Sequence, residues 1–487
     1  MTQTQTIRGM YIGGQWVQTA RSFADINPST GALYAEAPDG ARPEARMAIE
    51  AAHGAFKAWA AMKYTQRAHL LLKAADIWER RTPDYIAAAQ AEGGGWVGKG
   101  GFEAHYVAEV FRSAAAACYH NLGEILPSEY GKFSTAVRYP MGVISVISPW
   151  NFQGILTSRG FAFALAAGNT IVLKPSEDTP YSGGLYFAEI LHEAGFPPGV
   201  FNVITCSREN VGAMGDEMIE HPHVKGISFT GSTPVGRSIA AKAGAHLKKA
   251  CVELGGKDSL IILEDAEMER ATQAANFGSF MHQGQICMSV EKVLVHQSIY
   301  AEFLARFAER AARLKVGDTA DKSNVIGPLI NDRQVARVKA QLDDAIAKGA
   351  RVIVGGGING RFVGPTILAD VTPDMLVYRD ETFGPVVPVI PFATDEEAIA
   401  INNDTEYGLS AGVFTANEAR ALDIARRLET GMCHVNCSSV NDEPHVPFGG
   451  SKASGLGRHG GRWSIETFTE TRWITLDRGG RPYPPVF

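Results

Sequence analysis

Short apolar runs alternate with amphipathic stretches along much of the chain. Val143–Ile147 and Thr170–Lys174 are apolar runs, and residues 155–167 between them have the apolar spacing of a helix. The same alternation resumes after Gly255–Gly256 and continues to about residue 465. Apolar strands that alternate with helices form parallel sheets covered by helices on both faces. The pattern therefore predicts an α/β fold with two doubly wound domains.

The two ends of the chain have a different pattern. Glycines interrupt short strand-like runs in residues 8–30, which predicts a small β-meander. Ala-rich amphipathic stretches predict helices within residues 43–123. Arg472–Asp477 is strand-like but has no partner nearby in the sequence, and a lone exposed strand tends to pair with another. We therefore expect it to pair with residues 134–139 or with another subunit.

Bulk properties exclude several classes of protein. The chain has 487 residues, which is too long for one hydrophobic core, and its 45% hydrophobic and 20% charged residues are ordinary for a soluble enzyme. A formal net charge of -6 disfavours nucleic acid as a partner, because phosphate binding needs a positive surface. No apolar run approaches the ~20 residues that cross a bilayer, and the polar start, Met1–Thr6, lacks the features of a secretory signal.

Cysteine usage indicates a reducing compartment. The six cysteines have no spacing typical of a disulfide framework, which favours the cytoplasm. Cys433, His434 and Cys437 have no second ligand pair at zinc-site spacing. We therefore expect them to be small residues in or beside a strand, and we expect no metal.

Cys287 lies where a helix-like run, residues 266–282, gives way to the strand-like Lys292–Val295. Most free cysteines are small buried hydrophobes. A cysteine at such a junction is also placed to react with a substrate, and the start of a helix or a nearby base would favour its thiolate. Three other stretches with chemically suited side chains favour the nucleophile: residues 148–152, 252–257 and 381–385.

Two of these stretches offer a base and a hydrogen-bond donor. Glu253 ends an apolar run before a double glycine, and burial would raise its pKa toward neutrality and suit it to proton abstraction. Alternatively, it pairs with Lys257. Asn151 follows the strand that ends at Ile147, so its amide would face the crevice at the strand ends and could donate to an oxyanion. Alternatively, residues 149–152 are only a turn.

The glycine patterns separate two candidate phosphate sites. Gly455–Gly460 matches G-x-G-x-x-G, but no strand precedes it and no amphipathic helix follows, so we expect a mobile surface loop. Gly231 and Ser232 lie between a strand and a helix, where a phosphate can bind at the helix N-terminus. Lys174 and Glu177 follow another strand and have the groups that hold a ribose. Because Glu177 would repel a 2′-phosphate, NAD is favoured over NADP.

Together these stretches, from Tyr11–Trp16 to Pro447–Gly455, resemble the aldehyde dehydrogenase superfamily over nearly the whole chain. The resemblance implies a cysteine nucleophile, a glutamate base and an oxyanion hole completed by the cysteine N–H: Cys287, Glu253 and Asn151. It implies that Lys174 and Glu177 bind the adenosine ribose and Ser232 the pyrophosphate. It also implies that Glu381 binds the nicotinamide ribose, with Phe383 and Trp150 lining the cofactor.

His282–Ser289, Asn441–Pro444 and Trp96 resemble the benzaldehyde, vanillin and salicylaldehyde dehydrogenase branch more closely. By similarity, Trp96 stacks on an aromatic ring, and Arg159 positions a ring substituent or the carboxylate product. Alternatively, Trp96 is a core residue and Arg159 makes a structural salt bridge. Gly93–Gly95 departs from the pattern, since three glycines should loosen a helix.

The resemblance implies a domain organisation and an assembly. We expect an NAD-binding domain, a catalytic domain and a β oligomerisation element in the following ranges: residues 1–123 with 142–254, residues 255–465, and residues 124–141 with 466–487. We expect a homodimer or homotetramer in the cytoplasm, with a small-molecule aldehyde as substrate and neither nucleic acid nor membrane as partner.

The expected reaction is NAD-dependent oxidation of an aldehyde, of the aromatic type, through a thiohemiacetal and a thioester on Cys287. Four alternatives remain open. An aliphatic aldehyde or a semialdehyde is a different substrate for the same chemistry. Acyl transfer to coenzyme A would have less need of Glu253, a cysteine hydrolase would need His282 as its base, and a non-catalytic binding protein would need none of these residues.

Overall fold

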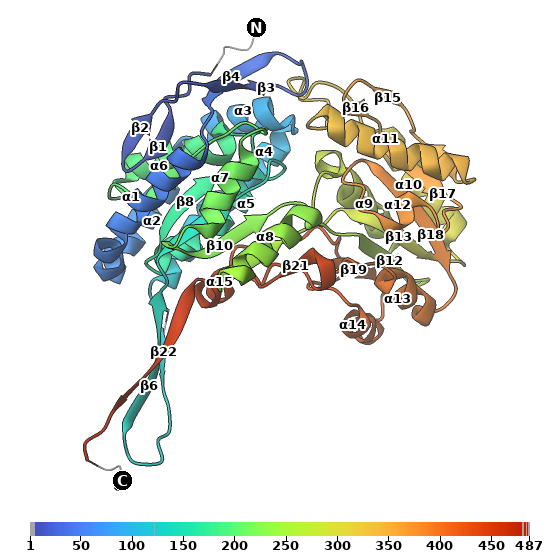
Figure 1. Ribbon diagram of the computed structural model, residues 1–487. Coiled ribbons are helices and arrows are strands. Elements are labelled where there is room, and N and C mark those ends of the chain that lie inside the picture. Colours follow the sequence, from blue (N-terminus) through green and yellow to red (C-terminus); the bar gives the residue numbers. More distant parts are fainter. Residues whose placement is uncertain (1–4, 121, 480–481, 484, 486–487) are drawn as a thin grey trace.

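The computed structural model describes residues 5–120, 122–479, 482–483 and 485. The expectations about the first four residues and the extreme C-terminal tail therefore lie partly outside the described residues. Within the described ranges, no helix is both long and apolar enough to cross a membrane. Figure 1 shows two α/β lobes side by side, with a long β arm that projects from the first of them.

An eight-stranded sheet forms the centre of the first lobe in the described chain. Its strands, in spatial order, are β2 (Gln15–Val17), β1 (Met10–Ile12), β9 (Phe201–Val203), β8 (Thr170–Lys174), β7 (Val143–Ile147), β10 (Val224–Thr230), β11 (Lys249–Glu253) and β21 (Gly455–Leu456). The strands from β9 to β11 are parallel, and β1 and β21 pair with them antiparallel. The predicted parallel strands are confirmed.

Helices cover both faces of this sheet because successive residues of a strand point to opposite faces. In β7, Val143 packs with α1 and α7, whereas its neighbour Ile144 packs with the helices of the other face. The helices of this lobe are α1 (Arg42–Ala61), α2 (Tyr64–Arg80), α3 (Thr82–Gly93), α4 (Val97–Ala117), α5 (Gln153–Ala166), α6 (Tyr186–Ala194), which follows a π-helical turn, α7 (Val211–Glu220), α8 (Thr233–Ala245) and α15 (Gly461–Thr467).

A seven-stranded sheet organises the second lobe in the same way. Its strands, in order, are β14 (Arg351–Val354), β17 (Thr366–Ala369), β18 (Val386–Phe392), β13 (Val290–His296), β12 (Asp258–Ile262), β19 (Ala411–Phe414) and β20 (His434–Val435). In β12, Leu260 packs with α9 and α10, and Ile261 packs with α13 and α14 on the opposite face. The helices are α9 (Met268–Phe280), α10 (Tyr300–Ala312), α11 (Asp332–Ala347), α12 (Leu376–Arg379), α13 (Asp395–Asn403) and α14 (Glu418–Arg427). The predicted doubly wound α/β class is confirmed.

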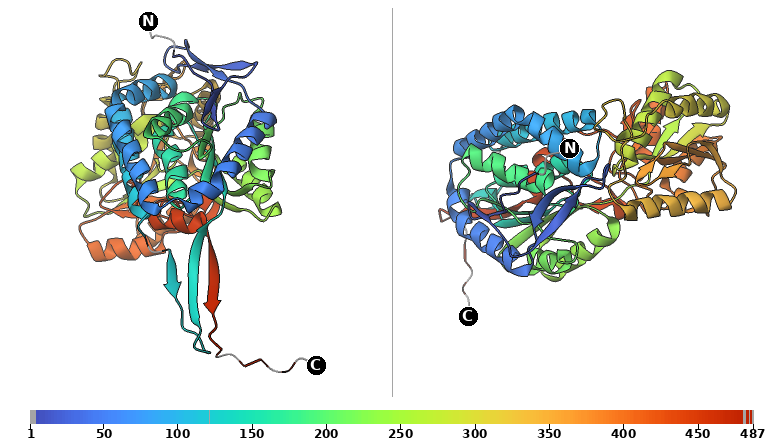
Figure 2. Two further views of the ribbon diagram at one scale, coloured as in Figure 1. Left: turned by 90° about the vertical axis from the view of Figure 1, so that its left-hand side faces the viewer. Right: turned by 90° about the horizontal axis from the view of Figure 1, so that it is seen from above.

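The arm is a three-stranded antiparallel sheet of β5 (Gly123–Ile125), β6 (Phe133–Pro140) and β22 (Thr469–Leu476). Strand β22 pairs with β6 along its whole length, so the predicted pairing of the C-terminal strand with residues 134–139 is confirmed. The left view in Figure 2 shows the arm extending away from the two lobes. The minor strands are β3 (Ser22–Ile26) with β4 (Leu33–Pro38), and β15 (Ile358–Asn359) with β16 (Phe362–Val363).

Two predictions about irregular segments were wrong. Residues 8–30 do not form one meander, because β1 and β2 join the large sheet whereas β3 pairs with β4 in a separate ribbon. Gly455–Gly460 is not a mobile surface loop: Gly455–Leu456 pairs with the last two residues of β11, and His459 is buried. A glycine run in sequence does not reveal that a distant strand covers it.

Candidate active site

Two cavities meet at Cys287. The larger has a volume of about 640 Å³ and the smaller about 160 Å³. Cys287 and Asn151 line both cavities, whereas Glu253 lines only the smaller one. Aromatic and aliphatic side chains together form most of the lining of the larger cavity, and the aromatic ones include Trp96, Phe102, Tyr106, Phe152, Phe277 and Phe448. The predicted nucleophile, base and amide, which are far apart in sequence, therefore lie around one point.

Cys287 follows a 3-10 turn, Met281–Gly284, and precedes β13, so it does not stand at the start of a helix. Of the two settings considered above for the thiolate, the start of a helix is absent and a nearby carboxyl group, Glu253, is present. Burial raises the pKa of Cys287 well above its usual value, and the negative charge of Glu253 raises it further. The guanidinium of Arg159 acts in the opposite direction but does not prevail. The resting side chain is therefore a neutral thiol.

Glu253 is the last residue of β11 and is buried. Neither of its carboxylate oxygens has a hydrogen-bond partner among the described residues. Burial raises the pKa of Glu253 to about 8. Lys257, considered above as its partner, instead donates to Glu291 at 2.8 Å. An unpaired carboxyl beside the thiol is suited to accept and release protons near neutral pH.

Asn151 lies in the turn that joins β7 to α5 and is buried. Its Nδ2 donates to the carbonyl of Gln285 at 3.0 Å, which fixes the amide beside the segment that carries Cys287. A primary amide has two N–H donors, so the second remains for a ligand. The turn at residues 149–152 therefore also places an amide donor beside Cys287.

The smaller cavity lies at the carboxyl ends of β7, β10 and β11, where ligands bind in parallel sheets. Five of the predicted cofactor residues line it: Trp150, Gly231, Ser232, Glu381 and Phe383. Ser232 directly precedes α8, so the free N–H groups at the start of that helix can bind an anion in this cavity. The rings of Trp150 and Phe383 meet edge to face, with centroids 5.5 Å apart.

Lys174 and Glu177, the remaining predicted cofactor residues, do not line this cavity. Lys174 is the last residue of β8, is buried and donates to the carbonyl of Pro175 at 2.8 Å. Glu177 forms an ion pair with Arg208 at 3.2 Å. Both lie at the carboxyl end of β8, the strand next to β7, whereas the other five line the cavity at the ends of β7, β10 and β11.

A charged residue inside β13 holds the segment that contains Glu381 and Phe383. The carboxylate of Glu291 accepts the backbone N–H groups of Thr382 and Phe383 at 2.7 and 2.8 Å, in addition to the Lys257 ammonium. Phe383 has a φ of 53°, a conformation that non-glycine residues rarely adopt without such support. The sequence analysis missed Glu291, and its signal was a glutamate within a buried strand.

Glu381 lies at the inner end of the same segment. The N–H of Gly256 donates to its carboxylate at 3.2 Å, and burial raises the pKa of Glu381 to about 7. Arg337 forms an ion pair with it at 3.4 Å. Its carboxylate therefore sits between the double glycine after Glu253 and a cation on α11.

Trp96 and Arg159 both line the larger cavity. Trp96 is 38% exposed and directly precedes α4, so it is not a core residue. Arg159, on α5, forms a buried ion pair with Asp442, which also accepts from the Tyr106 hydroxyl at 2.6 Å. Arg159 therefore makes the structural salt bridge and reaches the cavity as well. Asp442 belongs to the Asn441–Pro444 stretch noted above, but the sequence did not indicate that it pairs with Arg159.

The three glycines before Trp96 end a helix and do not loosen one. Helix α3 ends at Gly93, and Gly94 adopts a φ of 64°. A Cβ on Gly94 would lie 2.7 Å from Pro328, and its carbonyl accepts from Gln283 at 3.3 Å. The glycines therefore let the wall of the larger cavity pack closely against the segment before Cys287.

His282 does not act on Cys287. Its ring is buried, and neither ring nitrogen has a hydrogen-bond partner in the described part of the chain. Burial lowers the pKa of His282 well below its usual value. The cysteine hydrolase alternative therefore lacks its base.

A thiol placed between an aromatic cavity and a cleft at the ends of parallel strands is what a dinucleotide-dependent enzyme with a covalent thiol step requires. Residues 16–474 match the Aldehyde dehydrogenase family, and the chain belongs to that family.

The similar proteins extend over nearly the whole chain. A vanillin dehydrogenase from Pseudomonas fluorescens is 42% identical and covers 98% of this chain and 99% of its own length. A benzaldehyde dehydrogenase [NAD(+)] from Pseudomonas putida is 40% identical, with 98% of each chain covered. The crystal structure of a salicylaldehyde dehydrogenase from Pseudomonas putida G7, complexed with salicylaldehyde, has a TM-score of 0.96 at 39% identity and covers 99% of this chain and 100% of its own.

Proposed function

We propose that the protein oxidises an aromatic aldehyde to the carboxylic acid with NAD as its cofactor. The observation that carries the proposal is that Cys287 and Asn151 line both cavities, so a carbonyl carbon bound in the aromatic cavity would lie beside the cofactor cleft. The names of the three relatives support an aromatic substrate, and one of them supports NAD.

The chain's own residues account for the covalent chemistry. The sulfur of Cys287 loses its proton to solvent and attacks the aldehyde carbon, and the oxygen becomes anionic. The Asn151 amide and the Cys287 N–H stabilise this oxyanion, as donors aimed at developing charge do. NAD, when bound, supplies the hydride acceptor, and loss of hydride leaves a thioester on Cys287. Glu253 then activates the water that hydrolyses the thioester.

The residues of the smaller cavity fit a dinucleotide. The N–H groups at the start of α8, with Gly231 and Ser232, suit a pyrophosphate, and the Glu381 carboxylate suits the hydroxyls of a ribose. Trp150 and Phe383 offer apolar ring surface beside them. Lys174 and Glu177 would bind the second, adenosine ribose, one strand further along the sheet. In the larger cavity, Trp96 would stack on the aromatic ring and Arg159 would position its substituent.

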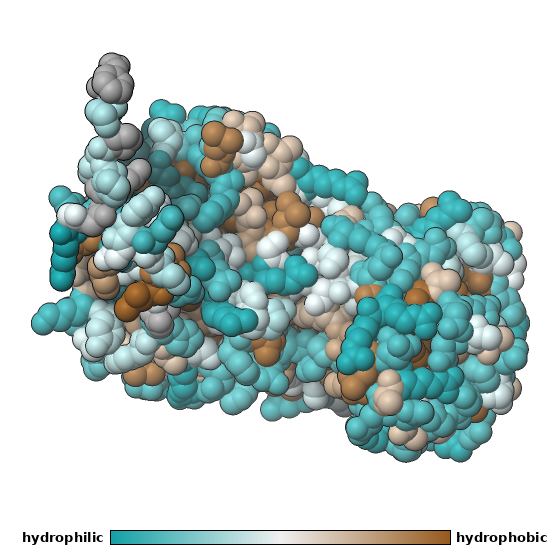
Figure 3. All heavy atoms as spheres, turned by 90° about the horizontal axis from the view of Figure 1, so that it is seen from below, coloured by the Kyte–Doolittle hydropathy of each residue, from teal (hydrophilic) through white to brown (hydrophobic). Residues whose placement is uncertain are grey.

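The arm suits a role in assembly. Its outer strands expose large apolar side chains, including Trp473 at 70% and Ile125 at 76%. Figure 3 shows that brown apolar patches interrupt the hydrophilic surface on the side from which the arm projects. We therefore assign the arm to contacts between copies of the chain in a homodimer or homotetramer. We retain the domain limits given above and a location in the cytoplasm as part of the proposal.

A comparison of aldehydes tests the proposal. The purified protein with NAD should form NADH with benzaldehyde and its hydroxylated or methoxylated derivatives at a kcat/KM well above that for straight-chain aldehydes and semialdehydes. Omitting coenzyme A should not lower the rate. Cys287→Ser should give no NADH with any of them. A preference for straight-chain aldehydes would refute the aromatic substrate, and a requirement for coenzyme A would refute hydrolysis.

A further inference from the structure

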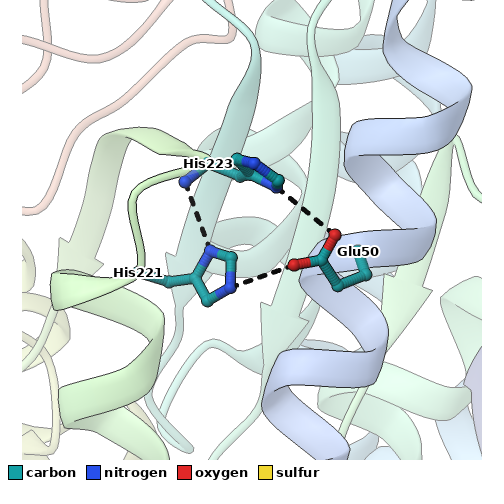
Figure 4. A group of neighbouring side chains, drawn as sticks. All are labelled: Glu50, His221 and His223. Carbon is teal, nitrogen blue, oxygen red and sulfur yellow. Dashed lines mark hydrogen bonds and ion pairs between the residues drawn. The ribbon is translucent and has the colours of Figure 1, made fainter.

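A second cluster of chemically active side chains lies outside both cavities. Glu50 on α1 meets His221 and His223, which lie in the short segment that joins α7 to β10 (Figure 4). Glu50 Oε1 lies 3.2 Å from His221 Nε2, and Glu50 Oε2 lies 3.4 Å from His223 Nδ1. One nitrogen or oxygen from each of the three residues lies within 4.8 Å of the others.

These distances are close to those between the ligands of one metal ion. Atoms about 2.0–2.1 Å from a tetrahedral zinc ion lie about 3.3 Å from one another. His223 Nδ1 is buried and makes no hydrogen bond with any residue that the structure describes, although it points at Glu50. Two imidazoles and a carboxylate that converge on one point are a donor set that suits Zn²⁺ and the neighbouring divalent transition metals.

The surroundings add a possible ligand and limit the competing charge. His53, one turn after Glu50 on α1, is exposed and stacks on His223 with ring centroids 3.7 Å apart. Arg46, one turn before Glu50, would repel a cation, but Glu217 holds its guanidinium at 2.8 Å. His53 or water can therefore complete the coordination.

We propose that Glu50, His221 and His223 form a binding site for a divalent transition-metal ion such as Zn²⁺. The ion would clasp α1 to the segment that leads into β10, a central strand of the first sheet. The site is independent of the proposed reaction, because none of the three residues lines either cavity. Sequence spacing did not reveal it, since Glu50 and the histidines are far apart in the chain.

The hydrogen bonds within the cluster limit the affinity of the site for a metal ion. His221 Nδ1 accepts the N–H of His223 at 3.2 Å, so a neutral His221 carries its proton on Nε2, facing Glu50. A metal must displace that proton, and a proton that moves to Nδ1 breaks the bond to the His223 N–H. Strong sites place an acceptor behind each histidine. Binding should therefore be weaker than at such sites.

Calorimetric titration with Zn²⁺ tests the site. The full-length Cys287→Ser protein is used, because the Cys287 thiol is itself a zinc ligand. We expect one Zn²⁺ per chain at this site, with affinity lowered about tenfold or more when Glu50→Gln or His223→Gln is added. His246→Gln, an exposed histidine at the end of α8, should leave the affinity unchanged. Equal affinity in all variants, or no binding, overturns the proposal.

The visible spectrum of the Co²⁺-loaded Cys287→Ser protein gives a second result that does not depend on changing the cluster. Coordination by histidine and carboxylate alone supports the site. Sulfur-to-cobalt charge-transfer absorption would place the ion at a cysteine and overturn it. Glu50→Gln and His223→Gln on the parent chain should form NADH at the parent rate in the presence of EDTA, which shows that loss of metal binding does not reflect loss of the fold.

Discussion

Burial determines the protonation of the two reactive side chains. Cys287 and Glu253 lie together in a dry site, where burial raises the pKa of both. The charge of Glu253 raises the pKa of Cys287 further, whereas the Cys287 thiol lowers that of Glu253. At neutral pH the pair is therefore largely a thiol and a carboxylic acid. Reaction requires a proton to leave the pair, and the base form of Glu253 limits how fast water can be activated for hydrolysis of the thioester.

The first prediction concerns pH. Because the pKa of Glu253 is raised to about 8, its carboxylate form is scarce below pH 8 and prevails above it. The rate of thioester hydrolysis should therefore rise through about pH 8 and level off at higher pH. Single-turnover hydrolysis measured across this range checks it, and Glu253→Gln should remove the inflection. An inflection near the ordinary carboxyl value, pH 4–5, would contradict the raised pKa.

The second prediction concerns the buried pair Arg159–Asp442. Asp442→Ala leaves the Arg159 cation buried without its partner, and removal of one member of such a pair costs about 3–5 kcal/mol. We expect a lower thermal midpoint and a higher KM for aromatic aldehydes. Glu443→Gln, at the exposed neighbouring carboxylate, should stay within about 0.5 kcal/mol of the parent. Equal stability of the two variants would contradict the structural role of the pair.

The sequence allowed prediction of those site residues whose position follows from the strand or helix beside them. Cys287, Glu253 and Asn151 each follow or end a recognisable strand or helix, and parallel strands carry such positions to one edge. It did not reach Asp442 or Glu291, because their partners are distant and no local pattern links them. The start of a helix, one of the two settings considered for Cys287, is absent because helix α9 ends before this residue.

At the scale of elements, the apolar runs predicted the limits of the strands well, whereas the end of the helix before Cys287 was predicted less well. Strands β7 and β8 begin and end at their predicted limits, since buried parallel strands are continuous apolar runs. The helix predicted for residues 266–282 ends at Phe280, and His282 and Gln283 have positive φ. No propensity indicates such a turn, because contacts with Gly94 and Pro328 hold it in place.

The third prediction concerns the segment between α12 and β18. Glu291→Ala removes the acceptor of two backbone N–H groups and leaves the Lys257 ammonium without its carboxylate. We expect Phe383 to lose its position, the KM for NAD to rise about tenfold, and the KM for the aldehyde to change little. Steady-state kinetics with each substrate varied in turn checks this. Glu302→Gln, an exposed glutamate on α10, is the control. A rise confined to the aldehyde KM would contradict the assignment.

At the scale of the whole molecule, the arm is the part that the lobes do not explain. Strand β22 follows α15, leaves the first lobe and pairs only along β6, so its exposed side chains cover no core of their own. A long strand with exposed apolar residues invites association. The sequence indicated that this strand needs a partner. It could not indicate how much of the strand remains exposed after it pairs with β6.

The fourth prediction concerns assembly. The double change Ile125→Glu with Trp473→Glu places charges on the exposed apolar surface of the arm. We expect the mass in solution, measured by light scattering, to fall to that of a smaller assembly. Leu422→Glu, at a 48% exposed leucine on α14 of the second lobe, should leave the mass unchanged. An unchanged mass for the double variant would show that the arm is not the interface.

The covalent step at Cys287 is tested most directly by rapid mixing of Glu253→Gln with NAD and an aromatic aldehyde. The account predicts a burst of about one NADH per chain, followed by a stall, with the acyl group found on Cys287 by mass spectrometry. Cys287→Ser should give no burst under the same conditions. Absence of a burst from Glu253→Gln would mean that this glutamate acts before hydride transfer, and a burst from Cys287→Ser would contradict the covalent mechanism itself.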